Sequence, residues 1–147
     1  MVRADVSTTI KRPVEDVFAV ISDGRRHPQW VSSVNEMTQT SDGPIGVGTT
    51  WHGVSKFLGR RMETDQVYTE FEPNRRLTWE ATTPFPMTFV FTFEAVAGGT
   101  RVTQVVEAEP GGFFKLAGPL LVSAAKRQFQ TDLDNLRDLM EGDALGD

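Results

Sequence analysis

The sequence has no cysteine and only two histidines among its 147 residues. Without cysteine, a disulfide framework and any thiolate metal site are excluded. A metal site needs three or four converging ligands, and the two histidines, His27 and His52, stand far apart in the sequence. We therefore expect neither a metal nor a cofactor.

Long hydrophobic runs are also missing. Lys115 and Pro119 interrupt the best candidate, residues 113–125, before it reaches the ~20 residues of a membrane-spanning helix. The first residues, MVRADVSTT, lack the apolar core of a signal peptide, so we expect a cytoplasmic protein without stable membrane insertion. The net charge of -5 argues against binding to a phosphate backbone, and we expect no nucleic-acid partner. The oligomeric state stays open.

The chain shows no repeat or linker, and residues 1–147 are predicted to form a single domain.

The longest helical pattern covers residues 119–141. Apolar residues recur within the helical pattern at steps of three or four, which predicts one buried stripe. The stripe consists of Val122, Ala125, Phe129, Leu133, Leu136 and Met140. Pro119 suits the first turn of this helix; if residues 113–118 form an earlier turn, Pro119 marks a kink instead.

The rest of the chain predicts strands, apart from one short helix. Residues 4–10 alternate as a strand, and Pro13 then opens a helix that ends at residues 22–24. Further strands are predicted at 34–40, 47–58, 62–71, 76–82, 87–96 and 100–109, separated by turn-rich segments. Their one-sided alternation is typical of an antiparallel sheet with one face in water.

The inner face of this predicted sheet is unusually aromatic. Alternation places on it Val47, Thr49, Trp51, Gly53, Ser55, Phe57, Val67, Phe71, Leu77, Trp79, Ala81, Met87, Phe89, Phe91, Phe93, Val102, Gln104, Val106 and Ala108. His52 falls on the outer face. A curved sheet around one helix can either pack these side chains into a core or leave a cavity that they line, and the pattern alone does not decide between the two.

Several local phrases carry a family resemblance. They are VSTTIKRPVEDVFAVISDGRRHPQW at 6–30, GVGTTW at 46–51, FEPNRRLTW at 71–79, GGTRVTQVVEAEP at 98–110 and DLDNLRDLME at 132–141. Together they resemble the START-like, helix-grip (SRPBCC) superfamily, in its polyketide cyclase/dehydrase and lipid-transport branch. The resemblance implies an α+β fold in which a curved antiparallel sheet of about seven strands wraps around a long C-terminal helix, with short N-terminal helices. It also favours the cavity over the packed core.

The resemblance does not imply one chemistry, because members bind lipids, plant hormones or quinones, or cyclise polyketides. Our leading hypothesis is a small, largely apolar ligand, lipid- or polyketide-like, in a cavity of roughly 300 to 1,000 Å³ between sheet and last helix. The predicted ligand-binding residues are Trp51, Thr49, Ser55, Phe57, Trp79, Phe89, Phe91, Gln104, Phe114, Leu121, Ala125 and Phe129. We also predict that Phe129 and Trp79 are both buried and face one another.

A polyketide cyclase or dehydratase is the first alternative, with Glu63, Asp65 or His27 moving protons. Glu63 and Asp65 lie an even number of residues before Val67 and Phe71, which are predicted to face inward. Side chains at even spacing along a strand lie on the same face, which would place both carboxylates in the cavity. If this strand extends past the edge of the sheet, or contains a bulge that reverses the alternation, both carboxylates would instead lie in water, and we favour this placement. His27 lies in a polar segment, where we expect a surface position.

The second alternative is a module that docks a partner or a membrane surface without an enclosed ligand. The apolar pairs Phe113-Phe114 and Leu120-Leu121 would form its contact surface. This alternative predicts affinity for a surface but no cavity.

Overall fold

The computed structural model describes residues 2–83, 85–111 and 113–142, without the side chains of Phe113, Phe114 and Ala117. The elements are β1 (Val2–Ile10), α1 (Val14–Ser22), a 3-10 helix η1 (Gly24–Arg26), α2 (His27–Trp30), β2 (Val34–Gln39), β3 (Thr50–Phe57), β4 (Arg60–Glu72), β5 (Arg76–Ala81), β6 (Met87–Val96), β7 (Gly99–Ala108) and α3 (Phe113–Glu141). Each predicted strand is present, with ends that differ by a few residues.

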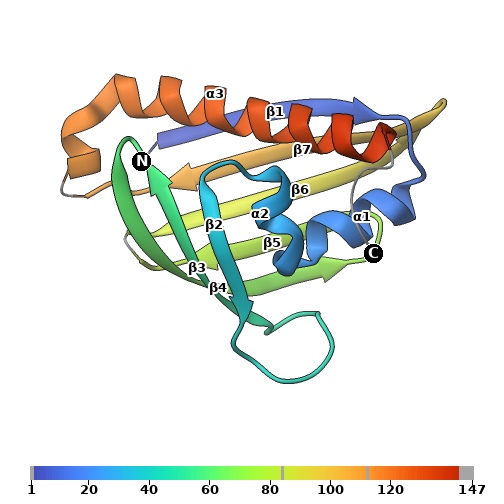
Figure 1. Cartoon of the computed structure of the whole chain (residues 1–147), viewed down its shortest axis with the longest axis horizontal. Helices are drawn as coiled ribbons and strands as arrows, with labels where there is room; N and C mark the ends of the chain where they lie inside the picture. Colours follow the sequence, from blue (N-terminus) through green and yellow to red (C-terminus); the bar gives the residue numbers. More distant parts are fainter. Residues whose placement is uncertain (1, 84, 112, 143–147) are drawn as a thin grey trace.

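The strands form one seven-stranded sheet in the order β1-β7-β6-β5-β4-β3-β2. Every pair is antiparallel; β1 joins β7, with Val6 opposite Gln104. The sheet curves around one face, on which α3 lies along β1 and α1 lies towards the C-terminal end of α3 (Figure 1). The predicted helix-grip architecture is therefore confirmed.

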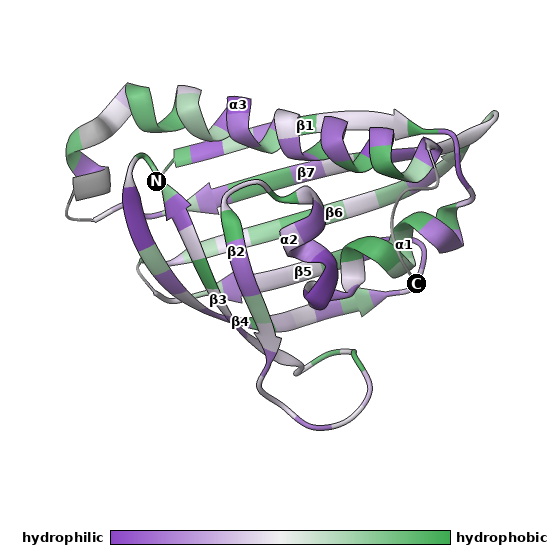
Figure 2. Cartoon of the chain, in the orientation of Figure 1, coloured by the Kyte–Doolittle hydropathy of each residue, from purple (hydrophilic) through white to green (hydrophobic). Residues whose placement is uncertain are grey.

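The long helix α3 is broken at Gly118, whose backbone angles (φ 48°, ψ −125°) are not helical. Glycine adopts a positive φ without the steric cost that a side chain would add. Pro119 follows directly, at a position where a missing N–H costs little. An early helical turn precedes Gly118, so of the two alternatives for Pro119 the kink is found, and the longer stretch of α3 follows it. Hydrophobic and hydrophilic residues follow one another in turn along α3, as expected for an amphipathic helix (Figure 2).

A bulge in β4 determines which of its side chains face inward. Tyr68 pairs with Trp79 and Glu70 with Thr78, so Thr69 is an extra residue relative to β5. One extra residue reverses the alternation of side chains on either side of it. In β4, odd-numbered residues therefore face inward after the bulge and outward before it.

This bulge and one loop correct part of the predicted inner face. Phe71, after the bulge, packs inside against Phe18 with ring centroids 5.2 Å apart. Val67, before the bulge, was predicted to face inward but pairs with outward-facing Glu80. Val47 was predicted in the same set, but it precedes β3 and is 69% exposed. Alternation predicts a face only where the pleat is continuous.

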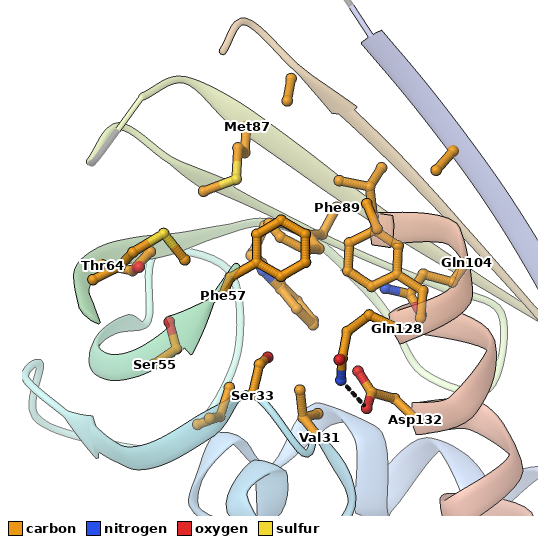
Figure 3. Close-up of a pocket in the computed structure, with 18 of the residues that line it drawn as sticks. Val31, Ser33, Ser55, Phe57, Thr64, Met87, Phe89, Gln104, Gln128 and Asp132 are labelled. Atoms are coloured by element: carbon orange, nitrogen blue, oxygen red, sulfur yellow. Dashed lines mark hydrogen bonds between the residues drawn. The ribbon is translucent and has the colours of Figure 1, made fainter. Parts of the chain in front are cut away.

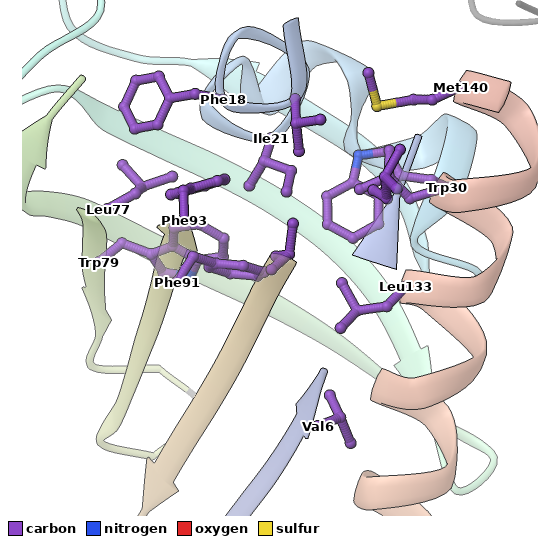
Figure 4. Packing of buried hydrophobic residues seen from close by; sticks show 14 of the residues in the cluster. Val6, Phe18, Ile21, Trp30, Leu77, Trp79, Phe91, Phe93, Leu133 and Met140 are labelled. Carbon is purple, nitrogen blue, oxygen red and sulfur yellow. The ribbon is translucent and has the colours of Figure 1, made fainter. Parts of the chain in front are cut away.

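The hydrophobic core fills one end of the space between the sheet and α3. Its members at this end include Val6, Phe18, Ile21, Leu77, Phe93, Leu133 and Met140 (Figure 4). Towards the N-terminal half of α3, Val122, Ala125 and Phe129 are only partly buried. Since α1 contributes core side chains at the first end, the two halves of α3 have different surroundings. Among the described residues, no helix is long and apolar enough to cross a membrane.

Candidate functional site

A partly enclosed cavity of about 160 Å³ lies between the sheet and the part of α3 from Leu121 to Asp132. Every strand contributes to its wall, as do α2 and α3, and the lining is mostly apolar (Figure 3). The volume is below the roughly 300 to 1,000 Å³ that we expected for a ligand pocket. It is close to that of an engineered apolar cavity of about 150 Å³ that binds benzene. In this conformation the cavity has room for a molecule of about one aromatic ring.

Many of the predicted ligand-binding residues meet at this cavity, and their role in binding stays a prediction. Those in the wall are Ser55, Phe57, Trp79, Phe89, Phe91, Gln104, Leu121, Ala125 and Phe129. The side chain of Phe114 lies outside the described part of the structure. Trp51 and Thr49 are described, but neither lines the cavity.

Trp51 and Thr49 are buried at other places. Trp51 packs against Gly24, where an added methyl group would lie 2.7 Å from the indole ring, and against Tyr68, with ring centroids 5.8 Å apart. The hydroxyl of Thr49 accepts a hydrogen bond from the Gly46 N–H at 2.8 Å. Both face inward as predicted, but the start of β3 is covered by η1 and by its own preceding loop, so no cavity reaches them.

Phe89 separates the two aromatic residues that we expected to face each other. It stacks on Trp79 with ring centroids 5.3 Å apart and contacts Phe129 edge-on at 6.2 Å. Trp79 is buried, as predicted, whereas Phe129 is only partly buried because it borders the cavity. The prediction that Phe129 is buried is therefore wrong, and Phe89 lies between the two rings across the space between helix and sheet.

Glu63 and Asp65 point to solvent on the outer face, where they flank His52. The His52 Nδ1 lies 2.8 Å from Asp65 Oδ1, and its Nε2 lies 3.2 Å from Glu63 Oε1. The hydrogen bond to Asp65, with that to Glu63, raises the pKa of His52 above its ordinary value. The favoured placement in water is therefore found, and of its two possible causes the bulge in β4 is the one present. Neither carboxylate can act on a ligand in the cavity.

His27, which we expected at the surface, is buried in the cavity wall. Its ring centroid lies 5.4 Å from that of Trp79, and its Nε2 lies 2.9 Å from the carbonyl oxygen of Ile21. A carbonyl only accepts hydrogen bonds, so Nε2 carries the proton and Nδ1 is an acceptor in the neutral ring. Burial lowers the pKa of His27 and favours this neutral form.

Asp132 on α3 is a cavity residue that was not predicted from the sequence. It is only 2% exposed. Its Oδ1 accepts hydrogen bonds from the Ser32 N–H (3.0 Å), the Ser32 hydroxyl (3.1 Å) and Gln128 Nε2 (2.8 Å; Figure 3). Burial raises the pKa of Asp132 to about 6, although these hydrogen bonds act in the opposite direction. Its position in the sequence could have predicted this burial. Asp132 lies three residues after Phe129 and four before Leu136, so it falls on the apolar stripe of the helix.

Further polar atoms in the cavity residues are buried without a hydrogen-bond partner among the described residues. They are Trp30 Nε1, Trp79 Nε1, Gln66 Oε1 and Gln104 Oε1. Buried polar groups are nearly always hydrogen-bonded, so unsatisfied donors and acceptors around one cavity are unusual. The site can therefore match a molecule that has polar groups as well as apolar surface. Within the described ranges, no group of three or more His, Cys, Asp or Glu side chains is arranged to hold a metal ion.

Solved structures with the same fold are numerous. A protein from Thermus thermophilus has a TM-score of 0.82 at 16% identity, over 98% of this chain and 100% of that chain. The corresponding values for Ara h 8.0201 are 0.72 at 15% identity, over 96% and 98%. For the Aha1 dimer from Colwellia psychrerythraea they are 0.69 at 19%, over 96% and 97%. At such low identity these similarities show the fold alone.

Comparison with curated protein sequences gives no significant match. A family match, in contrast, extends over residues 1–141, from β1 to the end of α3. It includes every element that lines the cavity and confirms the resemblance carried by the sequence motifs. The chain belongs to the polyketide cyclase / dehydrase and lipid transport family.

Proposed function

We propose that the protein binds a small, largely apolar molecule in the cavity between the sheet and α3. The observation that carries this proposal is the cavity wall, which is mainly apolar and aromatic with a few polar groups, as in most small-molecule sites. Membership of a family of hydrophobic-ligand-binding and cyclase-like proteins supports it. A lipid or polyketide longer than about one ring would have to extend through the opening or enlarge the cavity.

The proposed access route lies at the N-terminal end of α3. Met87, Ala108 and Val2 are neighbours in adjacent strands at this end, and all three line the cavity without being fully buried. The break at Gly118 supplies a point at which the first turns of α3 can move relative to the rest. A ligand could therefore enter without any disturbance of the core beneath the C-terminal half of α3.

The docking alternative has one supporting observation, because Leu116 and Leu120 are 90% and 66% exposed. Leu121, however, is buried and lines the cavity, so the predicted pair Leu120-Leu121 does not form one surface.

The cyclase alternative has different support: Asp132 and His27 both border the cavity and could each accept a proton. It would add turnover to the same binding site.

Filling the cavity tests the proposal. We expect p-xylene to bind the wild-type protein in calorimetry or ligand-observed NMR, because one ring fits the volume. Ala125→Phe places a ring inside the cavity and should weaken p-xylene binding at least tenfold. Ser123→Phe adds the same ring to an exposed position on the same helix and should leave binding unchanged. Equal affinity in the wild type and Ala125→Phe would place the binding site elsewhere and defeat the proposal.

A further inference from the structure

We propose that the ligand has a hydroxyl group, alcoholic or phenolic, that donates a hydrogen bond to the Asp132 carboxylate while its apolar body occupies the rest of the cavity. This inference rests on the proposed function and adds the ligand class. It assigns to Asp132 a recognition role at one end of an otherwise apolar site.

Among the residues that the structure describes, the hydrogen bonds to the Asp132 carboxylate leave one of its two oxygens available. All three bonds from Ser32 and Gln128 reach Oδ1. An ionised carboxylate has two oxygens and about four lone-pair positions, so Oδ2 can accept further donors. Ser32 follows α2 whereas Gln128 lies one turn earlier on α3, and together they fix the carboxylate from two elements. A fixed acceptor loses little conformational entropy when a ligand binds.

The surroundings of Asp132 favour a ligand that is apolar apart from one donor. Figure 3 shows Asp132 and Gln128 reaching from α3 into a space that Val31 and Phe89 also border. In such surroundings a carboxylate is costly unless its oxygens accept hydrogen bonds. A ligand hydroxyl at Oδ2 would reduce this cost, whereas a hydrocarbon ligand would displace water and increase it.

The other ionisable residues around the cavity do not compete for the same role. They are Arg3 on β1, which is exposed, and His27 on α2, whose burial favours the neutral ring. The donors that stabilise ionised Asp132 are the uncharged groups of Ser32 and Gln128. A ligand carboxylate would be repelled here, and a ligand ammonium would lose its hydration in an apolar space. A neutral hydroxyl avoids both costs.

A structural role for Asp132 is already visible, because its Oδ1 connects Ser32 to α3. Asp132→Asn separates this role from recognition. The amide oxygen of asparagine can still accept the bonds from Ser32 and Gln128, whereas its nitrogen replaces Oδ2 by a donor. A matched control is Asp134→Asn on the same helix, since Asp134 does not line the cavity and bonds to Gln130 at 3.1 Å.

The test compares p-cresol with p-xylene, which has a methyl group in place of the hydroxyl. We expect Asp132→Asn to weaken p-cresol binding about tenfold, the usual size of a hydrogen bond to a charged group, and not to weaken p-xylene binding, because a neutral amide costs less to desolvate than a carboxylate. Asp134→Asn should bind both probes as the wild type does. If Asp132→Asn binds both probes like the wild type, or weakens both equally, the inference is wrong while cavity binding stands. If neither probe binds the wild type, the proposed function itself fails.

A second measurement needs only the wild-type protein, in case Asp132→Asn does not fold. The carboxyl carbon of Asp132 can be followed by ¹³C NMR as a function of pH. Saturating p-cresol should lower the pKa of Asp132, because a donor stabilises the ionised form, and p-xylene should not lower it. His27, which shares the cavity wall, is monitored in the same titration so that its own change is not assigned to Asp132. A pKa of Asp132 that p-cresol leaves unchanged or raises would overturn the inference.

Discussion

Trp51 is an inward-facing aromatic residue that packs in the hydrophobic core and does not line the cavity. It is 1% exposed, and its indole ring lies directly under Gly24 of η1. A side chain larger than hydrogen at position 24 would occupy the space of that ring. The short helices η1 and α2 can therefore approach the sheet only because residue 24 is glycine. The space at the start of β3 is closed by this contact.

We predict that Gly24→Ala lowers the free energy of unfolding by about 1 to 3 kcal/mol, the usual cost of overpacking a core. The added methyl group would lie 2.7 Å from the Trp51 ring, so one of the two must move. Chemical denaturation measures the effect. Gly46→Ala is the control, because an added methyl group there meets no atom within 4 Å. Adding Trp51→Phe to Gly24→Ala should recover part of the loss, and no recovery would contradict the proposed clash.

Asp132 should make stability depend on pH. Its pKa is about 6 in the folded protein against 3.8 ordinarily, so as pH rises the unfolded chain ionises first. The contribution of Asp132 to stability is therefore most favourable below about pH 4, falls as the pH rises to about 6 and stays low above it, a change of about 3 kcal/mol in total. Asp132→Asn removes this dependence. Relative to the wild type, the variant should gain up to about 3 kcal/mol between pH 4 and pH 7 in urea titrations. A difference that is the same at both pH values would show that burial does not perturb Asp132.

At the scale of elements, the apolar stripe of α3 has different surroundings along its length. Leu133 and Leu136 are fully buried, whereas Phe129 and Ala125 border the cavity and are partly exposed. The same helical periodicity thus supplies core packing in one half and a cavity wall in the other. The difference arises from α1, which contributes to the core beside only one half.

We predict that Leu133→Ala costs about 2 to 5 kcal/mol of unfolding free energy, as expected for a fully buried leucine. Phe129→Ala should cost less, although phenylalanine is larger, because its ring is partly exposed and already borders a void. Denaturation midpoints of the two variants under the same conditions check this order. Should Phe129→Ala prove the more damaging change, the cavity would be filled in solution and the division of α3 would be wrong.

At the scale of the whole molecule, the cavity follows from the shapes of the layers. A seven-stranded sheet that curves around one helix encloses more space than that helix alone can fill. Beside the C-terminal half of α3, side chains of α1 such as Phe18 and Ile21 occupy the remaining space. Beside the N-terminal half, the strands and α3 supply the wall, and a cavity of about 160 Å³ remains. The packed core and the cavity thus lie at opposite ends of one interior.

The sequence by itself determined the strands, the first short helix, the long helix, their order and the family. Alternation and helical spacing are local properties, set by backbone geometry over a few residues, and they predicted all seven strands and the stripe on α3. The motifs at 6–30 and 132–141 indicated the family without any tertiary information. The placement of Ser55, Gln104 and Ala125 towards the space between sheet and helix followed from the same local patterns.

Only the tertiary structure decided which parts of that interior are core and which are cavity. The bulge at Thr69 moved Glu63 and Asp65 to the outer face, and no local pattern indicated its position. His27 and Asp132 became cavity residues because segments distant in the sequence cover them, and the Asp132 carboxylate is held by Ser32, 100 residues earlier in the chain. Burial and pKa depend on contacts of this long-range kind, which periodicity along a single strand or helix cannot reveal.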